Sequence, residues 1–162
     1  MIGLELKAEL EGVTNLHFRD SQTEYYQFKF RVECEGCHEE NPKPVDFNAH
    51  EKVEAEHTRG EFSFVMKCKM CKRTGTILVH SVSKNGYSSE DAKSVNMATF
   101  DVRGLRLIEF VPDGLFKCES AHSAAKFDEV ELIDGEWYDY DESASSEVSI
   151  QNVEWSLVKL KH

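Results

Sequence analysis

Two Cys-x-x-Cys pairs constrain this chain more than any other feature of its sequence. Cys34 and Cys37 form the first pair and Cys68 and Cys71 the second, and together they use four of the five cysteines. Each pair can supply two thiolates from one tight turn, which is how structural zinc sites complete a tetrahedral shell. A shell closed by four protein ligands leaves no position for water or substrate. The sequence therefore predicts one zinc ion per chain, in a site that stabilises the fold rather than catalysing a reaction.

Other uses of the cysteine pairs fit the sequence less well. A Cys-x-x-Cys pair can be a redox dithiol, but neither pair lies in a strand-helix-strand pattern typical of thioredoxins. His38 completes a Cys-x-x-Cys-His pattern, as in c-type haem attachment, which would need a translocated protein. Met1–Lys7 has neither the basic start nor the apolar run of a secretory signal. A secreted disulfide scaffold is disfavoured for the same reason, and by the odd fifth cysteine. We expect reduced thiols in a cytoplasmic or nuclear compartment.

The size of the chain is sufficient for a core of its own. The protein has 162 residues, 40% of them hydrophobic, and a chain of this length buries about 68–70% of its extended surface. Zinc therefore need not supply the whole stability of the fold. Because no segment approaches the roughly 20 apolar residues of a membrane helix, we expect a soluble protein, and we expect it to be a monomer.

The charge of the chain is unevenly distributed. The formal net charge is −11, which disfavours a phosphate-backbone partner. Residues 128–147 hold nine acids and no Lys or Arg, so the acidity is concentrated in one segment. Basic side chains surround the second cysteine pair at Lys67, Lys69, Lys72 and Arg73. Because a four-thiolate zinc site carries a net charge of about −2, nearby cations stabilise it. We interpret the basic cluster in this way and keep a nucleic-acid-binding zinc ribbon as an alternative.

Apolar and polar residues alternate in several segments. The alternation covers residues 4–10, 26–33 and 62–66, and an apolar run at 77–79 follows the second cysteine pair. A period of two is typical of strands that bury one face. The predicted zinc therefore lies where strand ends meet.

The C-terminal segment alternates with a change of parity. Val148 and Ile150 share one parity, whereas Val153, Trp155 and Leu157 have the other. One extra residue near Gln151-Asn152 would produce this change, so the sequence predicts a β-bulge there. Helical periodicity is poor throughout, apart from a short turn in Ser120–Lys126. The predicted class is all-β, with antiparallel strands in a sandwich or barrel-like arrangement.

The sequence also contains an internal similarity. Leu10–Phe18 aligns without gaps on Val102–Phe110, with a glycine at the third position and a phenylalanine at the last position of both segments. We interpret this as two pseudo-repeated β units, a zinc-bearing unit at 1–83 and a second unit at 91–162, packed as one compact protein. The polar stretch Ser83–Glu90 would connect them. A chance match between two strand-turn segments is the alternative.

Several motifs in this order point to a known family. They are Leu4-x-Leu-Lys-Ala-x-Leu-Glu-x-Val-Thr-Asn-Leu16, the two Cys-x-x-Cys pairs, Arg103-Gly-Leu105 with Phe110-x-Pro112, and Trp137-x-Asp-Tyr-Asp-Glu142. Together they closely resemble the eukaryotic CXXC-motif-containing zinc-binding protein family over nearly the whole chain. The resemblance implies a small all-β protein with one zinc held by Cys34, Cys37, Cys68 and Cys71, and it implies no reaction. The stretch Asn41–Val45 looks like an insertion that departs from the family pattern.

Catalytic constellations are largely missing from the sequence. There is no phosphate-binding loop, no Gly-x-Ser-x-Gly and no His-Glu-x-x-His. Cys118 is the remaining cysteine, and a β-rich chain with two zinc-binding pairs and an extra cysteine is similar to zinc-containing methionine sulfoxide reductases. The Arg-x-Cys-x-Asn-like surround of that nucleophile is missing here. Lys117 would lower the thiol pKa and Glu119 would oppose it. We therefore expect an ordinary free thiol and no enzyme, with a thiol-redox enzyme as the alternative.

The acidic segment also contains aromatic residues. Trp137, Tyr138 and Tyr140 are interleaved with acids within 128–147, a composition suited to docking a basic partner. A calcium loop would need a 12-residue ladder of ligands that this segment lacks. We therefore predict a zinc-stabilised, non-enzymatic protein-interaction module.

Overall fold

The structure is a computed structural model that describes residues 1–56, 58–88 and 93–160. These residues form fourteen strands and no helix, so the predicted all-β class is confirmed, and none of the described segments is a helix able to cross a membrane. The strands are β1 (Ile2–Glu11), β2 (Val13–Phe18), β3 (Phe28–Cys34), β4 (Val45–Phe47), β5 (Val53–Ala55), β6 (Thr58–Phe62), β7 (Phe64–Lys67), β8 (Thr74–Val82), β9 (Val95–Arg103), β10 (Leu105–Phe110), β11 (Leu115–Ser120), β12 (Lys126–Glu131), β13 (Trp137–Asp141) and β14 (Ser146–Lys159).

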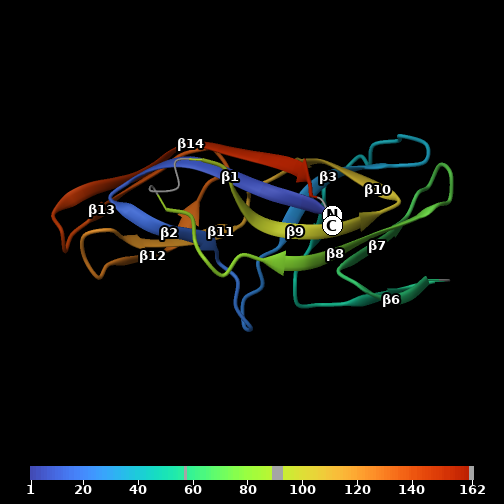
Figure 1. The fold of residues 1–162 in the computed structure, drawn as a ribbon, viewed down its shortest axis with the longest axis horizontal. Coiled ribbons are helices and arrows are strands. Elements are labelled where there is room, and N and C mark those ends of the chain that lie inside the picture. The colour runs from blue at the N-terminus through green and yellow to red at the C-terminus, as the bar shows by residue number, and fades with distance from the viewer. Residues whose placement is uncertain (57, 89–92, 161–162) are drawn as a thin grey trace.

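The long strands form one central sheet. Its order is β13-β14-β1-β9-β8-β7, and all neighbours are antiparallel. Two three-stranded sheets, β10-β3-β4 and β12-β11-β2, contribute to the same core as the central sheet, and β5 and β6 form a separate hairpin. Figure 1 shows β13 and β12 near one end of the long axis and β7 and β10 near the other, with both chain ends on the latter side.

The predicted alternation places the expected side chains in the core. In β1, Leu4, Leu6 and Ala8 are buried, and β3 buries every second residue from Phe28 to Cys34. Polar neighbours face outward, because successive side chains of a strand point to opposite faces. In β1 and β3 alternation therefore predicted which face is covered, whereas β8 and β9 bury consecutive residues.

The predicted β-bulge is confirmed in β14. Lys7 of β1 pairs with Glu154, and Glu9 pairs with Gln151, so two residues of β14 lie opposite one residue of β1. Asn152 in the bulge has a φ of 52°, a left-handed conformation that Asn tolerates better than most residues. The bulge explains why the apolar positions of β14 change parity.

A cluster of aromatic rings forms the centre of the core. Phe100 of β9 is fully buried, and its ring lies edge-on to Phe28 and Phe30, with centroids 5.3 Å away in each case. Phe47 of β4 lies 5.9 Å from the same ring. These geometries are favourable for aromatic quadrupoles, and they join β3 and β4 of the first half of the sequence to β9 of the second half.

The strand pairings are symmetrical about the β1-β9 pair. Exchanging β1 with β9, β2 with β10, β3 with β11, β4 with β12, β7 with β13 and β8 with β14 reproduces the same three sheets. The similar segments Leu10–Phe18 and Val102–Phe110 occupy the matching corners of this arrangement. Gly12 and Gly104 turn these corners with φ of 75° and 73°. The symmetrical topology is what a duplicated unit would produce, and the duplication itself remains a prediction.

The two predicted units share one sheet. β1 lies between β14 and β9, so strands from 1–83 and 91–162 are direct neighbours. The segment expected as a polar linker also contributes to the core, because Tyr87 is 0% exposed and its backbone pairs with Leu16. The Tyr87 hydroxyl donates to the carbonyl of Ala8. The division into two units therefore stays a prediction. Residues 89–90 of the expected linker lie outside the described residues.

The shared aromatic core predicts cooperative unfolding. Replacing Phe100 by Ala should lower the free energy of unfolding by about 3–5 kcal/mol, because a large buried ring is lost and a cavity remains. Chemical denaturation would measure the loss, with exposed Tyr140→Ala as a control of small effect. Hydrogen exchange should rise together in residues 28–34 and 95–103. A rise confined to one of these segments would contradict a single core.

Candidate metal centre

The first cysteine pair forms a tight turn at the end of β3. Cys34 is the last residue of the strand, its N–H donates to the carbonyl of Glu39, and its carbonyl accepts from the N–H of His38. His38 has a φ of 62°, which lets the chain reverse immediately after Cys37. This turn brings both sulfurs to the same side of the strand end.

The second pair forms a matching turn between β7 and β8. The N–H of Cys68 donates to the carbonyl of Arg73, and the carbonyl of Cys68 accepts from the N–H of Lys72, whose φ is 66°. Cys68 is buried and Cys71 is half-buried. The predicted location of the cysteines at strand ends is therefore confirmed.

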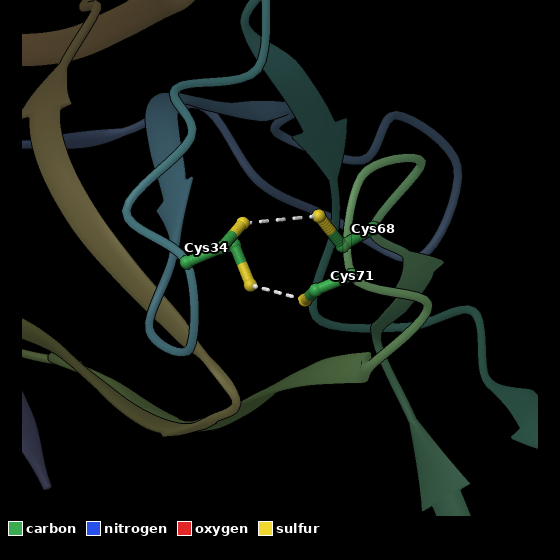
Figure 2. A group of neighbouring side chains, drawn as sticks. Cys34, Cys68 and Cys71 are labelled. Atoms are coloured by element: carbon green, nitrogen blue, oxygen red, sulfur yellow. Dashed lines mark hydrogen bonds between the residues drawn. The ribbon is translucent and has the colours of Figure 1, made fainter.

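The four sulfurs lie together in one cluster. All four lie within 4.8 Å of one another, with Cys34 Sγ 3.5 Å from Cys71 Sγ and Cys37 Sγ 3.6 Å from Cys68 Sγ (Figure 2). These separations are far longer than a disulfide bond of about 2.05 Å. A regular tetrahedron of thiolates around zinc at about 2.3 Å has edges of about 3.8 Å. The cluster fits zinc in size, in ligand type and in number.

Backbone N–H groups lower the pKa of two of these thiols. The N–H groups of Cys37 and Gly36 hydrogen-bond to the sulfur of Cys34 and lower the pKa of its thiol. Those of Cys71 and Met70 lower the pKa of the Cys68 thiol to about 6. Because zinc binds thiolates and competes with protons, these hydrogen bonds favour metal binding at neutral pH.

Two glycines hold the turns close together, and the sequence analysis noted only one of them, Gly104, as part of the internal similarity. A Cβ at Gly75, just after the second turn, would lie 2.3 Å from Leu105 Cγ. Gly104, with its positive φ, accepts a hydrogen bond from the N–H of Glu35 in the first turn. The only sequence signal for Gly75 was its position just after the second cysteine motif. Together they allow β8 and β10 to approach the metal site.

Two glutamates beside the first cysteine turn are paired with arginines of neighbouring strands. Arg106 lies 3.0 Å from Glu33, and Arg31 lies 2.7 Å from Glu40. Arg73 lies against Gly36, where a Cβ would approach its side chain to 2.8 Å. Exposed ion pairs contribute little stability, but here they place arginine charge beside the first turn, which is rich in glutamate.

Cys118 lies apart from the metal cluster. It is on β11 and is 3% exposed. Burial, assisted by the charges of Asp139 and Glu119, raises the pKa of its thiol to about 12. The redox alternative required an exposed thiol that ionises near neutral pH, and Cys118 meets neither condition.

Comparison with known proteins gives the family. The sequence profile described as "CXXC motif containing zinc binding protein, eukaryotic" matches residues 3–158. The chain belongs to this family. It is 39% identical over 156 residues to the UPF0587 protein C2D10.03c of Schizosaccharomyces pombe, covering 96% of each chain. It is 33% identical over 159 residues to the human CXXC motif containing zinc binding protein, covering 98% of each.

Solved structures agree with the fold. The crystal structure of C1orf123 superposes with a TM-score of 0.88 at 32% identity, covering 98% of this chain and 99% of that one. A hypothetical protein from Plasmodium falciparum superposes with a TM-score of 0.85 at 25% identity, covering 97% and 98%. Both solved chains share this fold over nearly their whole length. The name of the human relative indicates zinc binding, and neither it nor the UPF0587 name indicates a reaction.

The environment of Cys118 predicts slow chemical modification. At pH 7.5 iodoacetamide should label Cys118 in the native protein at least about a hundredfold more slowly than in the unfolded chain, because only the thiolate reacts and a thiol pKa near 12 leaves almost none. The labelling rate of native Cys118 should keep rising by about tenfold per pH unit well beyond pH 9, where an ordinary thiol with a pKa of about 8.5 levels off. Peptide mass spectrometry would follow the label, with Cys118→Ala as the control. Rapid labelling of Cys118 in the native protein would instead support the alternative of a thiol-redox enzyme.

Proposed function

We propose that this protein is a non-enzymatic interaction module with one structural zinc per chain. The observation that supports the metal's role is the cluster itself, where Cys34, Cys37, Cys68 and Cys71 can fill a tetrahedral shell with no open position. Bound zinc would supply a crosslink between the turn after β3 and the turn before β8. A closed site of this kind has no vacancy for a substrate.

The proposed docking surface lies around β13, in the acidic segment 128–147. β13 is an edge of the central sheet, with β14 as its sheet neighbour. Tyr138 and Tyr140 are 59% and 49% exposed. A groove of about 420 Å³ beside them is lined by both tyrosines and by acids that include Asp139 and Glu147. We name this surface, Tyr138–Tyr140 with Glu147, the β13 edge.

The chemistry of the β13 edge favours a basic, extended partner. An edge strand offers backbone groups to an added strand, and exposed tyrosines supply contact area with little loss of conformational entropy. Acidic side chains repel a second copy of this acidic chain and attract Lys or Arg. The proposed partner is therefore a basic protein segment. The chain itself would be a monomer of the cytoplasm or nucleus.

A nucleic-acid function has weaker support. The basic residues near the second turn sit in a chain with a net charge of −11, and Arg31 and Arg106 beside the first turn are already paired with glutamates. Phosphate binding needs unpaired cations on a continuous surface. The protein partner is therefore the function that the charge distribution supports best.

Binding of a basic peptide would test the β13 edge. The probe is a soluble peptide that alternates lysine with threonine, titrated at about 0.15 M salt while amide chemical shifts of the protein are recorded. Binding should shift residues 137–141. The pair D139N/E147Q should weaken it by about tenfold, as should Y138A/Y140A, which is a loss of about 1.4 kcal/mol each.

A matched control removes the same charge elsewhere. Glu54 and Glu61 pair with each other across the β5-β6 hairpin and are exposed, so E54Q/E61Q deletes two acids away from β13. This control should leave the affinity unchanged. Equal weakening by both pairs would mean that only net charge matters, and shifts centred on the second cysteine turn would also contradict the proposal.

A further inference from the structure

A second cluster lies at the symmetrical position of the metal centre. Exchanging β3 with β11 places Ser120, the last residue of β11, where Cys34 ends β3. Exchanging the β7-β8 pair with the β13-β14 pair places Asp141, the last residue of β13, at the position of Cys68, which directly follows β7. The spacing is also kept, because Ser123 and Ala144 then match Cys37 and Cys71. We name Ser120, Ser123, Asp141 and Ala144 the Ser-Asp cluster.

The backbone of the turn after β11 repeats two hydrogen bonds of the turn after β3, although the positive φ of His38 has no counterpart at Ala124. The N–H of Ser120 donates to the carbonyl of Ala125 over 2.9 Å, as that of Cys34 does to Glu39 over 2.9 Å. The next N–H of each turn donates to the carbonyl of the corner glycine in the other half. Ala121 bonds to Gly12 over 2.9 Å and Glu35 to Gly104 over 3.2 Å.

Side-chain acceptors in this turn also repeat. The sulfur of Cys34 accepts from the N–H groups two and three residues later, and the hydroxyl of Ser120 accepts from His122 and Ser123, again two and three residues later. The sulfur of Cys37 accepts from the N–H two residues later, and the hydroxyl of Ser123 accepts from Ala125. The turn thus keeps the hydrogen-bond pattern of a zinc-binding turn with oxygen in place of sulfur.

The turn between β13 and β14 shows the same correspondence. The N–H groups of the residues two and three positions after Cys68 hydrogen-bond to its sulfur, and those of Ser143 and Ala144 hydrogen-bond to the carboxylate of Asp141. The fourth residue after each acceptor has a positive φ, 66° at Lys72 and 51° at Ser145. The backbone there is shaped for two ligands, although Ala144 offers none.

Direct hydrogen bonds replace the metal in this cluster. The hydroxyl of Ser120 donates to Asp141 Oδ2 over 2.5 Å, and that of Ser123 lies 2.8 Å from the same oxygen. Asp141 is 1% exposed and Ser120 is 7% exposed. One carboxylate thus joins the turn after β11 to the turn after β13, the same connection that zinc would make between the two cysteine turns.

We propose that the Ser-Asp cluster is the metal-free counterpart of the zinc centre and a latent second zinc site. The two turns keep the N–H groups that point at three of the four ligand positions, while two neutral hydroxyls, one carboxylate and an alanine do not supply the four ligands of a closed zinc site. The protein therefore ties its two ends by different chemistry. Chelators and thiol oxidants act on the cysteine end, and the Ser-Asp end is insensitive to both.

Restoring four thiols should restore the metal site. The variant S120C/S123C/D141C/A144C, purified with zinc, should carry two zinc ions per chain where the unaltered protein carries one. With cobalt, the intense visible bands of tetrahedral thiolate coordination should double. The matched control A121C/A124C/E142C/S145C places the same number of thiols in the same two turns, each one residue out of register. This control should keep one metal.

A second variant tests the natural cluster without relying on the four-cysteine chain. D141A should increase hydrogen exchange of residues 120–125 and 142–146 by at least tenfold, while the zinc content stays at that of the unaltered protein. A folded four-cysteine variant that binds only one metal would overturn the proposal. So would a second metal bound equally by the out-of-register control, or unchanged protection in D141A.

Discussion

The four-cysteine cluster fixes the relation between two turns that are distant in sequence. Cys34 ends β3, and Cys68 lies beyond the β5-β6 hairpin and β7. Apolar burial contributes little at the tips of these turns, because Cys37 is exposed and Met70 is 69% exposed. Thiolates so close together repel one another unless a cation lies between them. The proposed zinc would therefore set the geometry of this end of the molecule, whereas the sheets beneath it pack around the aromatic core.

This division explains how a small β protein can hold two crosslinks of different kinds. The central sheet and the rings around Phe100 form one buried apolar cluster that contains none of the four clustered cysteines, so we expect the sheets to fold without metal. The turns at the two ends are too short to bury much apolar surface, so each pair of turns needs specific polar or metal bonds to hold it together. The cysteine turns obtain them from sulfur ligands, and the turns joined by Asp141 obtain them from hydroxyl-carboxylate bonds. The β13 edge lies beside the turns joined by Asp141. We expect this end of the molecule to keep its structure when the metal at the other end is lost.

The sequence predicted the ligands and the faces of the strands but could not predict their partners. Cysteine spacing identified the metal cluster because two short motifs encode two rigid turns. Alternation identified the buried faces of β1 and β3, and its change of parity located the bulge at Asn152. A period of two says which side of a strand is covered but not which strand lies beside it, so the position of β1 between β14 and β9 was not predictable. Tyr87 was missed for the same reason, since a single buried ring in a polar segment has no periodicity.

The most direct test of this account is X-ray absorption spectroscopy at the zinc edge, combined with elemental analysis of the same sample. The account predicts one zinc per chain, with four sulfur neighbours at about 2.3 Å and no oxygen or nitrogen in the first shell. Cys68→Ser should convert one of the four to a light-atom neighbour or lose the metal. Less than half an equivalent of zinc in metal-replete protein, or a shell that contains an open or light-atom position in the unaltered chain, would contradict the claim that the metal is a closed structural crosslink.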